Sequence, residues 1–238
     1  MHASTFERDG VVTLPSTDRW LPPVGPNVRM LRTAIQLGMR AALRTYNRLD
    51  VMGRENLPLD KSFVMIGNHS SHLDAVCLLA SLPLQRIHQA FPVAAADYFF
   101  STPWRRVLSM IAVNGVPLDR RHGSDALQAF RNLLRHSETV LIIFPEGTRT
   151  CSGTLGRFRS GVGRLVAGTD IPVVPCYLSG AFEAWPKGRS VPRPGALRLR
   201  IGRPRTFPGV LAADREAVAG ISWQLRDEVI ALRERREG

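Results

Sequence analysis

Two short apolar runs give the strongest local signals in this chain. Residues 62–67 read SFVMIG and residues 139–144 read TVLIIF, and neither run contains a charged side chain. Runs of this length that contain β-branched residues predict strands buried on both faces, which is the environment of a strand in a parallel sheet. A polar loop and then a stretch of helical periodicity follow each run.

The same alternation continues along the chain. We predict further strands at residues 91–95, 113–118 and 173–178, and helices at residues 73–82, 104–112, 124–136, 161–167 and 218–232. Residues 196–201 contain LRLRI, in which apolar and charged side chains alternate, so we predict an edge strand with one face in water. Strands that alternate with helices predict an α/β fold with a mostly parallel central sheet flanked by helices.

The N-terminal part of the chain has a different pattern. Four prolines interrupt residues 1–27, so we predict an extended N-terminal arm there. Residues 28–49 carry apolar side chains at spacings of three and four with arginines on another side, which predicts a basic amphipathic helix. Such a helix suits either the surface of an anionic membrane or the surface of the domain's own core. We expect residues 50–238 to form a single domain.

The charge of the chain favours an anionic partner. Its formal net charge is +12, and every basic residue except Lys61 and Lys187 is an arginine. Arginine binds a phosphate through two N–H groups at once, although a GC-rich coding bias would give the same preference for arginine over lysine. The excess of positive charge itself fits an anionic membrane or a nucleic acid.

Nothing in the sequence predicts a membrane span or a secretory signal. No window reaches the roughly 18 apolar residues of a membrane-spanning helix. Glu7, Arg8 and Asp9 stand where a signal peptide needs apolar side chains. The chain has three cysteines without a CxxC spacing, which indicates reduced thiols in a cytosolic compartment. If the protein meets a membrane, we expect it to lie on the surface.

The loop after the first apolar run concentrates reactive side chains. It reads NHSSHLD at residues 68–74, and ligands of open α/β folds bind beyond the carboxyl ends of the strands. If His69 lies in the loop and Asp74 in the first helical turn, the carboxylate can orient the imidazole to take a proton from an alcohol nucleophile. Helix capping by the serines or by Asp74 is the alternative. His69, His72 and Asp74 are also zinc-ligand types, but no further ligand cluster follows, so we expect no metal and interpret His72 as a neighbour.

The loop after the second apolar run reads PEGTR at residues 145–149. Its proline ends the strand and its glycine permits a tight turn. Glu146 and Arg149 are therefore expected at the strand exit, where an arginine can hold a phosphate and a carboxylate can hold a hydroxyl or orient the arginine. An exposed turn with a surface ion pair is the alternative. Residues 147–164 add glycines and arginines, which fits either a loop that admits an anionic head group or a solvated loop.

These residues resemble the glycerolipid acyltransferases, the family that contains 1-acyl-sn-glycerol-3-phosphate acyltransferase. NHSSHLD resembles the family's NHx4D box, and FPEGTR resembles its second strong motif, in the same order and at a similar separation. Weaker matches are VMGRENLP at 51–58, VPLDRR at 116–121, IPVVP at 171–175 and IGRP at 201–204. The resemblance covers roughly residues 50–206, and two strong motifs with four weaker ones in one order are specific.

The resemblance implies a glycerol-3-phosphate acyltransferase-like fold and transfer of a fatty acyl group to a lipid hydroxyl. In that family's terms, His69 would be the general base and Asp74 its orienting partner. The residues that would bind substrate are Glu146, Gly147, Thr148, Arg149, Arg120 and Arg159. The donor would be acyl-CoA or acyl-carrier protein, and the acceptor a lysophospholipid-like lipid, first of all 1-acyl-sn-glycerol-3-phosphate. We expect no cofactor and a peripheral position on the cytoplasmic face of an anionic membrane.

Two departures from the family pattern concern the acceptor. Family members often carry a lysine in the block that matches residues 91–97, where this chain reads AAAD, and the lysine of a later block is Arg159 here. An acyltransferase that acts on an aminolipid or glycolipid hydroxyl is therefore an alternative. A non-catalytic protein that binds lipid or nucleic acid is another. Because the arginines are scattered and aromatic residues make up only 7% of the chain, we expect no nucleic-acid partner.

Overall fold

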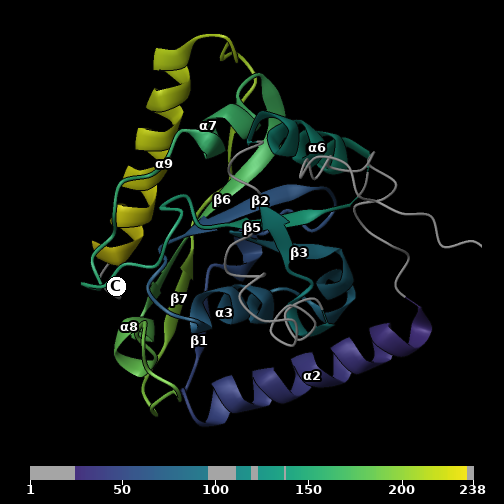
Figure 1. Ribbon diagram of the computed structural model, residues 1–238, viewed down its shortest axis with the longest axis vertical. Helices are drawn as coiled ribbons and strands as arrows, with labels where there is room; N and C mark the ends of the chain where they lie inside the picture. The colour runs from purple at the N-terminus through teal and green to yellow at the C-terminus, as the bar shows by residue number, and fades with distance from the viewer. Residues whose placement is uncertain (1–24, 96–110, 119–122, 137, 235–238) are drawn as a thin grey trace, which may run out of the picture.

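The computed structural model describes residues 25–95, 111–118, 123–136 and 138–234 (Figure 1). Within these residues, an eight-stranded sheet runs in the order β1-β7-β6-β2-β5-β3-β4, and β8 pairs with β6 outside this path. The strands are β1 (Asp50–Met52), β2 (Phe63–Gly67), β3 (Ala90–Ala95), β4 (Val116–Leu118), β5 (Val140–Ile143), β6 (Thr169–Ser179), β7 (Arg198–Ile201) and β8 (Arg205–Phe207).

The pairing of the strands confirms the predicted fold class. Strand β2 is parallel to both β5 and β6, β3 is parallel to β4 and β5, and β1 is parallel to β7. Only the pairs that β6 makes with β7 and with β8 are antiparallel among the described strands. The sheet is therefore mostly parallel, as strands alternating with helices predicted.

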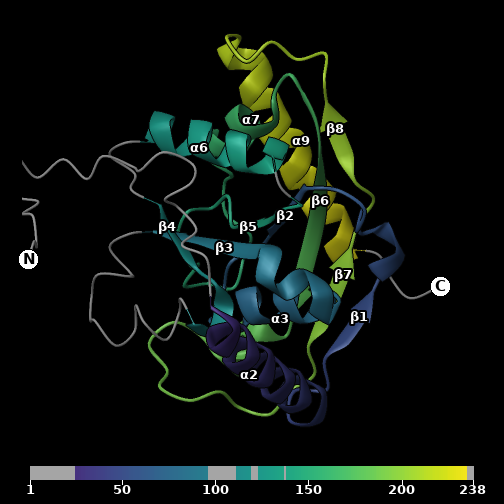
Figure 2. The ribbon, with the colours of Figure 1, turned by 90° about the vertical axis from the view of Figure 1, so that its right-hand side faces the viewer.

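Helices cover both faces of the sheet. They are α2 (Pro26–Thr45), α3 (Leu73–Ser81), α6 (Gly123–His136), α7 (Gly161–Val166), α8 (Ala181–Ala184) and α9 (Arg215–Glu234), with 3-10 turns η1 (Arg54–Asn56) and η2 (Leu84–Gln89). Figures 1 and 2 show α2 and α3 on one face and α6, α7 and α9 on the opposite face. The buried apolar side chains form two hydrophobic clusters. Within β2, Phe63 and Met65 belong to one cluster, whereas Val64 and Ile66 belong to the other. All four are fully buried, as expected for a strand covered on both sides.

One strand prediction was wrong in its position. The strand at residues 198–201, β7, is not at an edge, because the short strand β1 pairs with its outer side. Its predicted wet face is nevertheless present, since Arg198 is exposed while Leu199 and Ile201 are buried. Strand β1 has only three residues and no apolar alternation, so the sequence pattern did not predict it.

Helix α2 is attached to the rest of the protein by polar side chains. Arg32 and Gln36 are only 3% and 1% exposed, and they donate to the backbone carbonyls of Ile111 and Ala112 at 3.0 and 2.7 Å. Arg40 donates to two carbonyls near the end of α3, at Leu79 and Leu82. The side of α2 that faces the protein therefore carries Arg32 and Gln36 together with the apolar Leu43.

The outward side of α2 carries no charge between its flanking arginines. Met30, Leu31 and Leu37 are 72%, 49% and 48% exposed, and the small residues Ala34, Gly38 and Ala41 are exposed too. The helix predicted at residues 28–49 thus occupies Pro26–Thr45, while residues 1–24 of the predicted arm lie outside the described residues. None of the helices in the described segments combines the length and the apolar character needed to cross a bilayer.

Candidate active site

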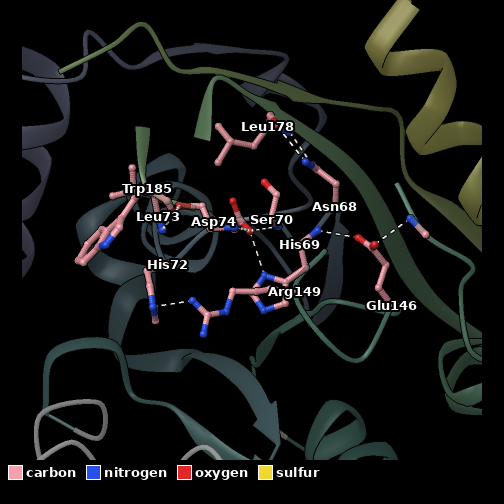
Figure 3. A network of polar contacts seen from close by, with 12 residues as sticks. Asn68, His69, Ser70, His72, Leu73, Asp74, Glu146, Arg149, Leu178 and Trp185 are labelled. Carbon is pink, nitrogen blue, oxygen red and sulfur yellow. Dashed lines mark hydrogen bonds and ion pairs between the residues drawn. The ribbon is translucent and has the colours of Figure 1, made fainter. Parts of the chain in front are cut away.

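The register of the sheet brings the two predicted loops together. Strand β2 pairs directly with β5, and Ile66 lies opposite Ile143. Because the strands are parallel, both loops leave the same edge of the sheet. The loops also touch, since the Thr150 N–H donates to the His69 carbonyl at 2.8 Å. Figure 3 shows the side chains that result from this meeting.

His69 and Asp74 form an oriented pair. Asp74 Oδ2 lies 2.9 Å from His69 Nδ1 and also accepts the backbone N–H groups of Ser70 and Ser71 at 2.7 and 2.8 Å (Figure 3). Asp74 is 1% exposed, whereas the His69 side chain is 23% exposed. Because Asp74 Oδ2 accepts two backbone N–H groups, it acts as an acceptor towards His69 as well. The proton of the neutral imidazole is therefore on Nδ1, and its lone pair is on Nε2.

The same carboxylate orients His69 and holds the loop that precedes α3 through the N–H groups of Ser70 and Ser71. The capping alternative also applies, but to a serine: Ser71 Oγ accepts the N–H of Leu73, the first residue of α3, at 3.1 Å. The ring of Phe144 adds a stacking contact to His69, with ring centroids 4.2 Å apart and planes 15° apart. Imidazole rotation is thus limited by a hydrogen bond at one end and by a flat apolar surface along one face.

Glu146 connects three backbone segments. Its Oε1 accepts the His69 N–H at 2.7 Å and its Oε2 accepts the Gly156 N–H at 2.8 Å. Burial raises the pKa of this carboxyl, while the two N–H donors act in the opposite direction. The residue is 8% exposed, so the alternative of an exposed turn does not describe Glu146. Both of its carboxylate oxygens hold backbone, which makes Glu146 a brace between the two loops.

The arginines of this region take different positions. Arg149 extends its Nη1 to His72 Nε2 at 2.5 Å (Figure 3). Arg159 donates from Nε to the Glu146 carbonyl at 3.3 Å and packs on Gly147, where a Cβ would lie 2.7 Å from that nitrogen. Gly147 has φ 74°, so both space and conformation favour glycine there. Thr148 is exposed, and Arg120 lies outside the described residues.

Sequence reasoning missed the residues that fix the first loop from outside. Asn68 is 7% exposed and pairs with both backbone groups of Leu178 on β6, at 2.9 and 2.8 Å. Ser71 donates to the Trp185 carbonyl at 2.8 Å. An asparagine directly after a buried strand is a usable signal for such a tie, whereas Trp185 is too distant in sequence to be found by spacing.

The described residues contain no group of three or more His, Cys, Asp or Glu side chains placed to hold a metal ion. What the arrangement offers is an oriented imidazole, buried carboxylates that fix it, and arginines beside it. These groups suit proton transfer next to an anionic substrate.

Comparison with known proteins assigns the chain to a family. Residues 48–179, more than half of the chain, match the family model described as Acyltransferase. The chain belongs to the acyltransferase family. The family resemblance inferred from NHSSHLD and FPEGTR is thereby confirmed.

Similar proteins carry one recurrent name. This acyltransferase family member is 34% identical over 167 residues to the chloroplastic 1-acyl-sn-glycerol-3-phosphate acyltransferase BAT2 of Brassica napus, covering 67% of this chain and 45% of that protein. It is 24% identical over 199 residues to 1-acyl-sn-glycerol-3-phosphate acyltransferase alpha of Mus musculus, covering 82% and 68% of the two chains. The alignment with BAT2 thus spans a little under half of that protein's length.

A solved structure shares the fold. The crystal structure of the 1-acyl-sn-glycerophosphate (LPA) acyltransferase PlsC from Thermotoga maritima matches with a TM-score of 0.65 and 24% identity. The match covers 89% of this chain and 83% of that chain, so the two proteins share their fold over most of their length.

Proposed function

We propose that this family member transfers a fatty acyl group from a thioester donor, acyl-CoA or acyl-carrier protein, to the hydroxyl of a lysophospholipid-like acceptor. The first candidate is 1-acyl-sn-glycerol-3-phosphate, because the similar proteins BAT2 and alpha are named for that acceptor. The observation that carries the proposal is the contact of His69 Nδ1 with buried Asp74 at 2.9 Å. It gives a side chain able to take a proton from an alcohol.

The proposed reaction proceeds in one displacement at the carbonyl carbon. His69 Nε2 takes the proton of the acceptor hydroxyl as its oxygen attacks the thioester carbonyl carbon. The C–S bond then breaks, and the departing thiolate takes the proton from the imidazolium. Asp74 stabilises the imidazolium between these steps. Neither loop supplies an obvious nucleophile at His69, so we propose no acyl-enzyme.

The acceptor's phosphate is assigned to the arginines around the PEGTR turn. Arg149 and Arg159 both follow Glu146 in the chain and flank the turn, and a guanidinium matches a phosphate with two parallel N–H bonds. Gly147 and Thr148 would border the same subsite, and Arg120 remains a further candidate. For Glu146 we propose that it holds the loops rather than the acceptor, since both oxygens accept backbone N–H groups.

We propose that the protein works peripherally at an anionic membrane surface, on the cytoplasmic face. The uncharged outer side of α2, with Met30 and Leu37 exposed, supports insertion of that side among lipid chains. Arg29 and Arg44 border this side and would meet anionic head groups. The free cysteines fit the reducing side of the membrane.

An acyl-transfer assay tests the chemical part. Purified protein is incubated with acyl-CoA or acyl-carrier protein and a panel of lyso-lipids, and products are identified by mass. We expect diacyl product from 1-acyl-sn-glycerol-3-phosphate and none from His69→Ala, which should keep the wild-type melting temperature. A folded His69→Ala enzyme with wild-type turnover would refute the mechanism. Glycolipid and aminolipid acceptors belong in the panel because this chain has alanines at residues 94–96, where the family resemblance led us to expect a lysine.

A flotation assay tests the membrane part with two matched substitutions. Leu37→Glu places a charge on the outer side of α2, and Leu211→Glu places the same charge at another exposed leucine. We expect Leu37→Glu to reduce binding to anionic vesicles and Leu211→Glu to bind like the wild type. Equal flotation of all three proteins would contradict docking through α2. Equal binding of the wild type to neutral and anionic vesicles would contradict the proposed attraction between arginines and anionic head groups.

A further inference from the structure

His72 contacts the side chain to which the acceptor's phosphate has been assigned. His72 lies in the same loop as His69, and its Nε2 is 2.5 Å from Arg149 Nη1 (Figure 3). A guanidinium has N–H donors and no acceptor, so in this contact His72 Nε2 is the acceptor and the ring proton is on Nδ1. Both histidines of the loop therefore present an Nε2 lone pair, one available to a hydroxyl and the other bonded to Arg149.

His72 is itself held in place. Its ring lies 5.1 Å from the Trp185 ring at 49°, and its neighbour Ser71 donates to the Trp185 carbonyl at 2.8 Å. The Trp185 indole N–H in turn donates to the Arg189 carbonyl at 2.8 Å. The imidazole thus sits against an anchored aromatic ring, at the residue that precedes α3. Because this acceptor is held in place, the hydrogen bond restricts the rotation of the long Arg149 side chain before substrate binds.

We infer that His72 is a positioning residue that directs the Arg149 guanidinium at the phosphate of the acceptor. This inference rests on the proposed function for the identity of the phosphate-bearing ligand. His72 makes no contact with the reacting atoms in this role and acts through Arg149 alone. Its effect therefore falls on recognition of the phosphate, and the proton transfer at His69 is unaffected.

Kinetics on two acceptors test this role. The variants are His72→Phe, which keeps a ring against Trp185 and removes the acceptor, and His72→Gln, which restores an acceptor oxygen. We expect His72→Phe to raise KM for 1-acyl-sn-glycerol-3-phosphate about tenfold, as loss of a hydrogen bond to a charged group does, with kcat within about twofold. KM for monoacylglycerol, which lacks the phosphate, should not change. His72→Gln should restore most of the affinity.

A double-mutant cycle separates action through Arg149 from a general structural effect. If His72 acts only through Arg149, His72→Phe adds no further loss in an Arg149→Ala background. Additive losses, an unchanged or lowered KM in folded His72→Phe, or failure of His72→Gln to restore affinity would each overturn the inference. Melting curves establish that each variant is folded.

Direct binding keeps this test independent of catalysis. The Kd of sn-glycerol 3-phosphate is measured by calorimetry for the wild type and His72→Phe, with a tenfold increase expected. If the wild type binds this ligand but transfers no acyl group, the proposed function fails while the Kd ratio still decides the role of His72. If the wild type forms diacyl product but binds sn-glycerol 3-phosphate no more tightly than His72→Phe does, the inference about His72 is overturned while the proposed function stands.

Discussion

Replacement of Glu146 by glutamine probes how the two loops are held together. The amide keeps one acceptor oxygen and puts an NH2 group where the other carboxylate oxygen was. One of the two backbone N–H groups, at His69 or Gly156, then faces a donor instead of an acceptor. Hydrogen bonds to a charged partner contribute about 1.5–3 kcal/mol each. Loss of about 2 kcal/mol of this restraint on His69 corresponds to roughly a 30-fold fall in kcat.

Stability should respond less than activity to the same change. Burial raises the pKa of Glu146, which means that the ionised carboxylate is costly in this position despite its hydrogen bonds. The neutral amide avoids that cost, and this gain offsets part of the lost bonding. We therefore expect Glu146→Gln to fold and to change the free energy of unfolding by less than about 2 kcal/mol. The activity loss then reports misplacement of His69 in a folded enzyme.

The assay is acyl transfer at saturating donor with product measured by mass spectrometry, beside a matched control. Glu138→Gln makes the same chemical change at a carboxylate whose side chain is 64% exposed and pairs with Arg86, and it should leave kcat within about twofold. A folded Glu146→Gln enzyme with wild-type kcat would refute the bracing role. An increase in acceptor KM alone would instead show that Glu146 contacts the acceptor.

Three further predictions use other contacts. Asp74→Asn should lower kcat by about 10²–10⁴-fold in the same assay, because the imidazole loses the group that orients it; a loss below tenfold would count against the pair. Burial and two neighbouring arginines hold the pKa of His88 below its ordinary value, so below about pH 6.5 the unfolded chain binds more protons and stability falls. The melting temperature of the wild type should therefore drop more steeply from pH 7 to pH 5 than that of His88→Asn, and parallel curves would disprove it. Gly163→Ala should lower the melting temperature by about 5–10 °C, because its Cβ would lie 2.2 Å from the Val218 carbonyl of α9; an unchanged melting temperature would show that the helices can separate at no cost.

The sequence predicted the centre of the fold better than its margins. Strands β2 and β5 were found because a short apolar run without charge, followed by a polar loop, indicates a buried strand on its own. Strands β1 and β8 were missed, since each has three residues and derives its order from a neighbour rather than from its own composition. The same absence of local signal in β1 led to the wrong prediction of β7 as an edge strand.

The contacts of the candidate site also divide into those that the sequence predicted and those that it did not. The proximity of His69 and Asp74 followed from a separation of five residues across a loop and a first helical turn. The contacts of Glu146 with the His69 N–H and of Arg149 with His72 each join residues 77 positions apart. They depend on β2 and β5 being adjacent, which periodicity alone does not reveal. A backbone N–H also has no sequence signature, so the role of Glu146 as a brace could not be read from residue types.

The direct pairing of β2 with β5 has a consequence for how such enzymes diversify. His69, the proposed base, and Glu146, its brace, follow neighbouring strands whose relative register is fixed by backbone hydrogen bonds along four residue pairs. We therefore expect that a change in the length of the chain between β2 and β5 leaves the distance between His69 and Glu146 unaltered. Such proteins can vary that connection while the proposed base and its brace stay in place.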